Sequence, residues 1–205
     1  MSELAPDPAV IASYRTALNQ CGATNKALGW TKEEKCLTRY LQLITGGSIQ
    51  HATVLDFGCG LGGLAKVVRS NNYLGVDPYA GFIGNARQAY PKHKFEVGTV
   101  EDLPQFGVSW DHVVACGVFT RMGKRDRPKH MDHIAETMRL LWESTRIGLH
   151  IDFLDESADR KGPTDFHISP WQAAIMASTL SKRWTLEAGY LPFEFCIHIL
   201  REEAP

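Results

Sequence analysis

Apolar residues follow two different spacings along this chain, and the change between them divides the sequence. From about residue 8 to residue 44 they recur every three or four positions, which predicts helices broken near Gly22 and Gly29. From residue 53 onward, short apolar runs alternate with stretches of helical spacing. The runs predict strands at residues 53–57, 73–77, 94–97, 110–116, 147–153, 184–188 and 195–200. The stretches between them predict helices at residues 64–70, 82–90, 127–144 and 170–180.

Strands that alternate with helices indicate an α/β fold with a mainly parallel sheet and helices on both of its faces. The last two predicted strands are joined by a short connection, Gly189 to Glu194, which permits antiparallel pairing. Gly46-Gly47-Ser48 separates the N-terminal helices from the first strand. We therefore expect one domain over residues 1–205, with a helical cap (1–47) and an α/β core (48–205).

Two helix starts carry recognisable capping signals. Thr31 with Glu34 predicts a capping box for the second N-terminal helix. Ser169 followed by Pro170 predicts the start of the last helix, because serine caps helices and proline is favoured in their first turn.

Composition excludes several classes of protein. The formal net charge of -1 gives no global attraction to nucleic acid or to acidic membranes. The cysteines form no C-x-x-C pair, which argues against a zinc site or a disulfide framework. No apolar run approaches the roughly 20 residues of a membrane span, and the first residues do not resemble a signal peptide. We expect a cytoplasmic protein without nucleic-acid or membrane partners; its oligomeric state is left open.

A glycine-rich turn follows the first predicted strand and fits two cofactor motifs. Gly58, Gly60 and Gly63 match the dinucleotide pattern G-x-G-x-x-G, with Asp77 about 20 residues further on. Asp56, Gly58, Gly60 and Gly62 match D-x-G-x-G-x-G. A carboxylate at the strand end favours a cationic ligand and would repel a pyrophosphate.

Residues 54–64 resemble motif I of the class I S-adenosylmethionine-dependent methyltransferases. This resemblance implies a Rossmann-like fold with seven strands, a C-terminal antiparallel strand and an N-terminal helical cap. It implies S-adenosyl-L-methionine as cofactor and S-adenosyl-L-homocysteine as product. Residues 27–30, 148–154, 167–170 and 189–195 are similar to a small bacterial subgroup, in which Asn usually stands at Asp152 and Tyr at Phe193.

The resemblance also implies which residues hold the cofactor. Asp77 would accept the ribose hydroxyls, although a helix-capping role is the alternative. The loop at residues 98–104 is similar to the family's adenine-reading loop, but Thr99 stands where Asp is usual. Adenine recognition is then left to Thr99, Val100, Glu101 or Asp102. The predicted cofactor-binding residues are Asp56, Gly58, Cys59, Gly60, Gly62, Asp77, Pro78, Thr99, Val100, Glu101 and Cys116.

Ligands in an open α/β sheet bind at the carboxyl ends of the strands. We therefore expect Phe119, Asp152, His167, Tyr190 and Glu194 to surround one pocket. His167 is the candidate base, because histidine titrates near neutral pH, and Asp152 would orient it or bind an amine. The predicted catalytic residues are His167, Asp152 and Tyr190, and the predicted substrate contacts are Phe119, Glu194 and Trp30.

Other histidines and a basic cluster have plainer interpretations. Trp30 itself belongs either to a lid loop or to the core. His130 and His133 share a helix face without a carboxylate partner pattern, so we expect them to be exposed and not to bind metal. We predict no metal site. The basic cluster after the fourth strand is either solvated or binds an anionic group of the substrate; it comprises Arg121, Lys124, Arg125, Arg127, Lys129 and His130.

The leading functional prediction is transfer of a methyl group to an O or N atom of a small molecule, such as a sugar, lipid or secondary-metabolite intermediate. A nucleic-acid methyltransferase is disfavoured, because Cys-Gly-Val-Phe follows the fourth strand where Asp/Asn-Pro-Pro-Tyr/Phe would stand. An NAD-binding oxidoreductase is disfavoured by Asp56. A non-catalytic cofactor-binding protein of the same fold stays open.

Overall fold

The computed structural model describes residues 4–30, 32–45, 49, 51–68, 70, 72–107 and 109–202. The predicted cap at Thr31 and the predicted linker Gly46-Gly47-Ser48 lie outside the described residues. Among the residues described, no helix is both long enough and apolar enough to cross a bilayer.

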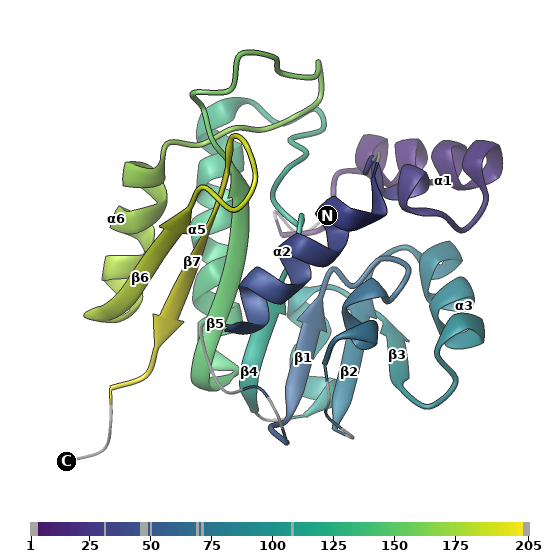
Figure 1. The fold of residues 1–205 in the computed structure, drawn as a ribbon, viewed down its shortest axis with the longest axis horizontal. Coiled ribbons are helices and arrows are strands. Elements are labelled where there is room, and N and C mark those ends of the chain that lie inside the picture. The colour runs from purple at the N-terminus through teal and green to yellow at the C-terminus, as the bar shows by residue number, and fades with distance from the viewer. Residues whose placement is uncertain are drawn as a thin grey trace.

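A seven-stranded sheet in the order β3-β2-β1-β4-β5-β7-β6 organises the molecule (Figure 1). The strands are β1 (Val54–Phe57), β2 (Tyr73–Asp77), β3 (Lys94–Val97), β4 (Trp110–Ala115), β5 (Thr145–Leu154), β6 (Arg183–Ala188) and β7 (Glu194–Leu200). The pairs among β1 to β5 are parallel, and β7 is antiparallel to both of its neighbours. The predicted fold class and the antiparallel pairing of the last two strands are confirmed.

Helices cover both faces of this sheet. They are α1 (Pro8–Cys21), α2 (Glu33–Thr45), α3 (Ala80–Ala89), α4 (Leu103–Phe106), α5 (Arg127–Glu143) and α6 (Pro170–Leu180). In Figure 1, α2 crosses the near face, α5 lies behind the sheet, and α1 lies beyond the carboxyl ends of β1 and β2.

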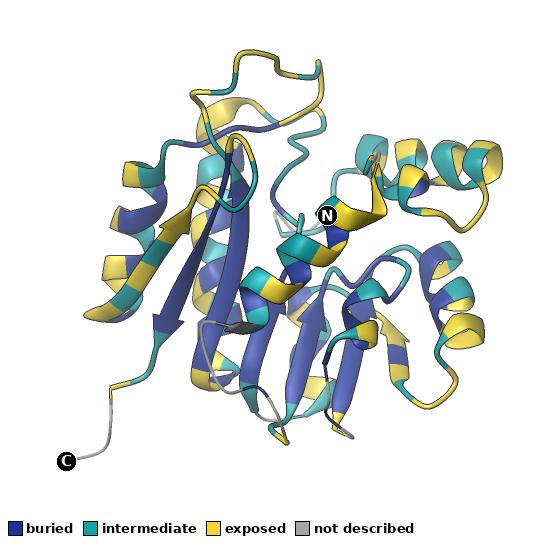
Figure 2. Ribbon diagram, viewed as in Figure 1, coloured by how far each residue is buried: buried dark blue, intermediate teal, exposed yellow. Residues whose placement is uncertain are grey.

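Alternate residues of the strands supply two separate apolar clusters. Leu55 of β1 packs in one cluster with Ile134 of α5. Its neighbour Val54 packs in the other with Leu43 of α2 and Ile83 of α3. The central strands are therefore buried along their length (Figure 2), as expected for a parallel sheet covered on both sides.

One predicted helix is wrong and three short elements were not predicted. The segment after the glycine turn forms only a 3₁₀ turn, η2 (Gly63–Lys66), in place of a helix to residue 70. Glycine and the β-branched pair Val67 and Val68 have low helix propensity, which accounts for the short element. The unpredicted elements are η1 (Asn25–Leu28), η3 (Val100–Asp102) and α4.

Candidate active site

The glycine turn lies where the strand order reverses, between β1 and β4. Crevices in open α/β sheets form at this point. Gly58 and Gly60 have φ values of 72° and 53°, which favour glycine. A Cβ atom on Gly58 would lie 2.6 Å from the Val118 side chain, and one on Gly60 would lie 2.9 Å from Leu28. The turn therefore requires glycine for both its conformation and its packing.

Asp77 is the carboxylate at the end of β2 and is tied to this turn. Its Oδ2 accepts a hydrogen bond from Gly60 N at 3.0 Å, and its Oδ1 accepts one from Tyr79 N at 2.8 Å. Burial raises the pKa of Asp77 to about 6. Because a carboxylate oxygen has about two acceptor positions, each oxygen can still accept one more donor.

Asp56 is buried in β1, just before the turn. The Tyr73 hydroxyl donates to its Oδ2 at 2.5 Å. Burial raises the pKa of Asp56 to about 7, and the charge of Asp77 adds to the increase. A cation bound beside Asp56 would therefore stabilise its ionised form.

One cavity contains most of the predicted cofactor site. All the predicted cofactor residues except Gly62 and Glu101 line it, and Trp30 lines it as well. Gly62 caps η2 from a left-handed conformation, and Glu101 is exposed on η3. Asp102 accepts hydrogen bonds from both the backbone and the hydroxyl of Thr99. The strand ends thus bring the acidic residues and the glycine turn to one wall.

Three of the predicted substrate-side residues lie together elsewhere, beneath α2. Asp152 accepts a hydrogen bond from Gly117 N at 2.6 Å, and burial raises its pKa to about 6. Glu194 forms a bidentate ion pair with Arg39 of α2, and both side chains are almost fully buried. Arg39 also stacks over Trp30, with its guanidinium carbon 5.0 Å from the ring centroid. Tyr190 packs partly buried against the cluster on this face of the sheet.

The expectation that these residues surround one pocket with Phe119 and His167 is not met by this geometry. The cavity lining includes none of the five residues Asp152, Glu194, Tyr190, Phe119 and His167. Phe119 is buried in the core and stacks on Phe153 at 5.9 Å. His167 hydrogen-bonds through Nδ1 to the Asp155 carbonyl at 2.9 Å. Their catalytic and substrate roles stay predictions.

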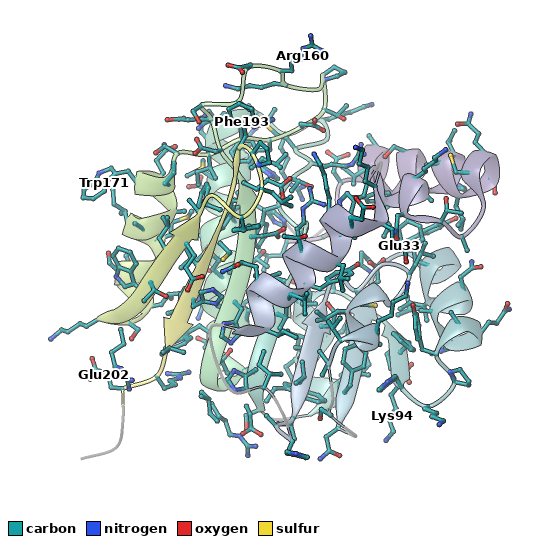
Figure 3. All side chains as sticks on the ribbon, in the orientation of Figure 1. Glu33, Lys94, Arg160, Trp171, Phe193 and Glu202 are labelled. Atoms are coloured by element: carbon teal, nitrogen blue, oxygen red, sulfur yellow. The ribbon has the colours of Figure 1, made fainter. Side chains whose placement is uncertain are left out.

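Figure 3 shows Phe193 in the β6–β7 turn, where it is 43% exposed.

The second wall of the cavity includes residues that sequence reasoning missed or placed wrongly. His130 was expected to be exposed, but it is 1% exposed and lines the cavity with His133 and Thr137. The signal was present, because His130 shares helical spacing with Ile134, Thr137 and Leu141, which are buried. Burial lowers the pKa of His130, so its imidazole is neutral at pH 7.

The basic cluster is divided between this wall and solvent. Arg121, Arg125 and His130 line the cavity, whereas Lys124 and Lys129 are exposed. The Arg121 guanidinium carbon lies 5.3 Å from the ring centroid of Tyr14 on α1. Residues of the N-terminal segment complete the roof of the cavity: Leu4, Pro6, Asp7, Val10, Ile11 and Tyr14. Within the described part of the chain, no group of acidic, histidine or cysteine side chains could hold a metal ion.

Comparison with known proteins finds a matching domain family and proteins of similar fold. The model of a family described as a methyltransferase domain matches residues 54–140. Among solved structures, magnesium protoporphyrin IX methyltransferase from Synechocystis PCC 6803 with bound SAH is similar, with a TM-score of 0.64, 14% identity, and coverage of 94% of this chain and 99% of that chain. A DhpI-SAH complex has a TM-score of 0.67, 14% identity, and coverage of 96% and 98%.

A small RNA methyltransferase is also similar in fold, with a TM-score of 0.61 and 17% identity, over 83% of this chain and 25% of that chain. A comparison with curated protein sequences finds no match to this chain. Residues 54–140 therefore match a methyltransferase domain, and the chain shares the fold of proteins solved with S-adenosylmethionine or S-adenosylhomocysteine bound.

The residues present fit S-adenosylmethionine as a bound cofactor. Its sulfonium and ammonium groups are cationic, and the wall contains two buried carboxyl groups and no lysine or arginine from β1 or β2. Gly58 and Gly60 line the cavity with backbone in the left-handed region that favours glycine. Asp77 keeps acceptor capacity for a ribose.

Proposed function

We propose that this protein transfers a methyl group from S-adenosylmethionine to an O or N atom of a small molecule bound in the same cavity. The observation that carries the proposal is the continuity of that cavity, which joins the glycine turn to Arg121, His130 and Thr137 under the roof made by α1. A roofed cavity suits a small acceptor better than a polymer. The near-neutral net charge supports the same choice.

In this proposal the acidic wall holds the cofactor. Asp77 accepts the ribose hydroxyls, and Asp56 lies on the side of the cationic groups. Thr99, Val100 and Pro78 flank the adenine, and the backbone at Cys116 faces the amino group of the methionine portion. Each of these residues lines the cavity, which supports the assignment.

Bound S-adenosylmethionine supplies an electrophilic methyl group on a sulfonium centre. The protein's contribution is to hold the acceptor atom in line with that methyl group and to exclude water. Apolar side chains of the cavity lining, including Val10, Ile11 and Leu28, exclude water. Trp30 is held in place between Arg39 and Tyr40, whose ring centroid lies 5.8 Å from that of Trp30.

Calorimetric titration with S-adenosylhomocysteine and, separately, with NAD tests the proposal. We expect micromolar binding of S-adenosylhomocysteine alone. Asp77→Ala should weaken it, whereas Asp159→Ala, which removes an exposed carboxylate outside the cavity, should not. Binding of NAD only, or of neither compound, would contradict the proposed function.

A further inference from the structure

The two walls of the cavity differ in charge. Asp56 and Asp77 form the acidic wall at the ends of β1 and β2. Arg121 and Arg125, with the neutral His130 beside them, form a basic wall, which comes from the loop after β4 and from the first turn of α5. The proposed cofactor accounts for the acidic wall. The cationic groups of the cofactor give no reason for the basic wall to take part in the cavity, and its one anionic group is the methionine carboxylate.

Arg121 is the arginine of this wall that lacks an acidic partner. No carboxylate among the described residues lies within ion-pair distance of it. Its Nη1 donates to the Thr164 hydroxyl at 3.4 Å. Asp165 forms a backbone bridge with Arg121, but its carboxylate accepts a hydrogen bond from Gly162 N. The Arg121 side chain also hydrogen-bonds Tyr14, and the other N–H donors of its planar fork have the geometry that binds a carboxylate or phosphate.

Arg125 differs from Arg121, although both line the cavity. It donates to the Ala5 carbonyl, and its charge helps to lower the pKa of Asp7. Asp7 is the carboxylate of the roof, and it accepts hydrogen bonds from Ala9 N and Lys124 N, both at 2.8 Å. The charge of Arg125 is therefore already matched within the protein, whereas that of Arg121 is not.

Buried polar atoms on α5 point independently to a polar ligand. His130 is 1% exposed and Thr137 is 2% exposed, and both line the cavity. His130 Nδ1 and Thr137 Oγ1 have no hydrogen-bond partner among the described residues. Buried polar atoms are normally paired, and leaving them unpaired costs stability. His130 Nε2 faces the Phe119 carbonyl oxygen, so in the neutral ring Nδ1 is an acceptor and needs a ligand hydroxyl or amine as donor, whereas Thr137 Oγ1 can donate to a ligand oxygen.

We propose that the methyl acceptor is a small molecule with a carboxylate or phosphate-type acid group, and that Arg121 binds this group beside the polar face of α5. This inference rests on the proposed function, because the acid group belongs to the acceptor of that reaction. It names the substrate class. The acid group is an anchor that fixes the orientation of the acceptor.

The test adds anions to protein saturated with S-adenosylhomocysteine and follows binding by calorimetry. The probes are salicylate, phenylphosphonate and the neutral salicylamide. We expect at least one anion to bind at least tenfold more tightly than salicylamide. Comparison of the two anions distinguishes a carboxylate acceptor from a phosphate-type acceptor.

Variants assign the effect to Arg121. Arg121→Gln should weaken binding of the anion at least tenfold and leave the affinity for S-adenosylhomocysteine within twofold. Arg121→Lys, which keeps the charge without the fork of donors, should have an intermediate effect. The matched control is Lys129→Gln, which removes one positive charge from the exposed part of the basic cluster and should change neither affinity.

The outcomes separate this inference from the proposed function. If wild-type protein does not bind S-adenosylhomocysteine, the proposed function fails. If it does bind, but salicylamide binds as well as both anions, the inference alone is overturned. It is also overturned if Arg121→Gln and Arg121→Lys leave anion binding unchanged. A loss of S-adenosylhomocysteine affinity in Arg121→Gln would assign Arg121 to the cofactor's own carboxylate and overturn it too.

Discussion

The acidic and basic walls of the cavity are built in different ways. The acidic wall consists of strand ends and a backbone turn: Asp56 and Asp77 are fixed by β1 and β2, and Gly60 N holds Asp77 directly. The basic wall depends on packing between distant segments, since Arg121 lies against Tyr14 of α1 and Arg125 bonds to Ala5. The first wall is therefore local and rigid. The second exists only while the N-terminal cap stays in place.

The largest expected effect comes from removing the buried Arg39–Glu194 ion pair, which joins α2 to β7. Arg39→Ala leaves Glu194 without its partner and Asp152 without a nearby positive charge, in a site where all three are buried. Breaking one partner out of a buried ion pair typically costs about 3–5 kcal/mol. We expect the free energy of unfolding, measured in denaturant, to fall by about that amount.

The control for this substitution is Arg139→Ala, which removes an arginine paired with Glu136 and Glu143 on the exposed face of α5. It should change stability little, because exposed ion pairs are screened by water. Equal losses of unfolding free energy in the two variants would show that the buried Arg39–Glu194 ion pair stabilises the protein no more than an exposed ion pair does.

A smaller effect, confined to the acidic wall, is expected for Asp77→Ala. Hydrogen bonds to a charged group contribute about 1.5–3 kcal/mol, so affinity for S-adenosylhomocysteine should fall roughly 10- to 100-fold. Calorimetry measures the change. Anion binding to the basic wall in the same variant, measured with salicylate, should fall less. A larger loss of salicylate affinity than of cofactor affinity would contradict the division between the walls.

Asp56→Asn should separate binding from stability. Because burial raises the folded pKa of Asp56 from 3.8 to about 7, the folded state keeps a proton that the unfolded state has lost between those values. Stability is thus lost as the pH rises from about 4 to 7. A shift of about three pKa units corresponds to at most about 4 kcal/mol, and the amide removes this penalty, so the unfolding free energy at pH 8 should increase by about 2–4 kcal/mol.

The same substitution should weaken binding of S-adenosylmethionine. Only ionised Asp56 attracts a cation, so wild-type affinity should decrease as the pH falls from 8 to 6, whereas the affinity of the variant should change less. Calorimetry at the two pH values makes the comparison. A steeper pH dependence in the variant would exclude Asp56 as the group that faces the cationic part of the cofactor.

The smallest effect is expected on the basic wall. Thr137→Val removes a buried hydroxyl that has no hydrogen-bond partner among the described residues and keeps the shape of the side chain. The ligand-free protein should gain about 1 kcal/mol in unfolding free energy, because the desolvation penalty disappears. Thr179→Val on the exposed face of α6 should change it little. A loss of stability in Thr137→Val would show that the hydroxyl is satisfied in the protein.

The sequence predicts the acidic wall well because its features are local. Each buried strand is a short apolar run, and Asp56, Gly58, Gly60 and Asp77 stand at fixed distances from the ends of those runs. The same locality explains the prediction of the α/β order and of the antiparallel last pair. The helix predicted at residues 64–70 was wrong because the apolar residues there have helical spacing, although Val67 and Val68 have low helix propensity.

The sequence predicts the basic cluster but not which of its members line the cavity, and it does not predict the buried Arg39–Glu194 ion pair, because the partners are distant in the sequence. Arg39 and Glu194 are separated by most of the chain, and no spacing rule links them. Asp152 and Glu194 therefore looked like free carboxylates beside a pocket, when their charge is matched by Arg39. His130 was expected to be exposed because it shares a helix face with His133 without a carboxylate partner pattern; the helical spacing with Ile134 and Leu141 was the better guide.

A crystal structure with bound S-adenosylhomocysteine tests the account most directly. The account predicts the ribose hydroxyls on Asp77, the amino group of the ligand on the side of Asp56, and its sulfur facing the space beside Arg121 and His130. Ribose bound away from Asp77, or ligand seated in the separate groove lined by Cys36, Leu37 and Lys66, would contradict it.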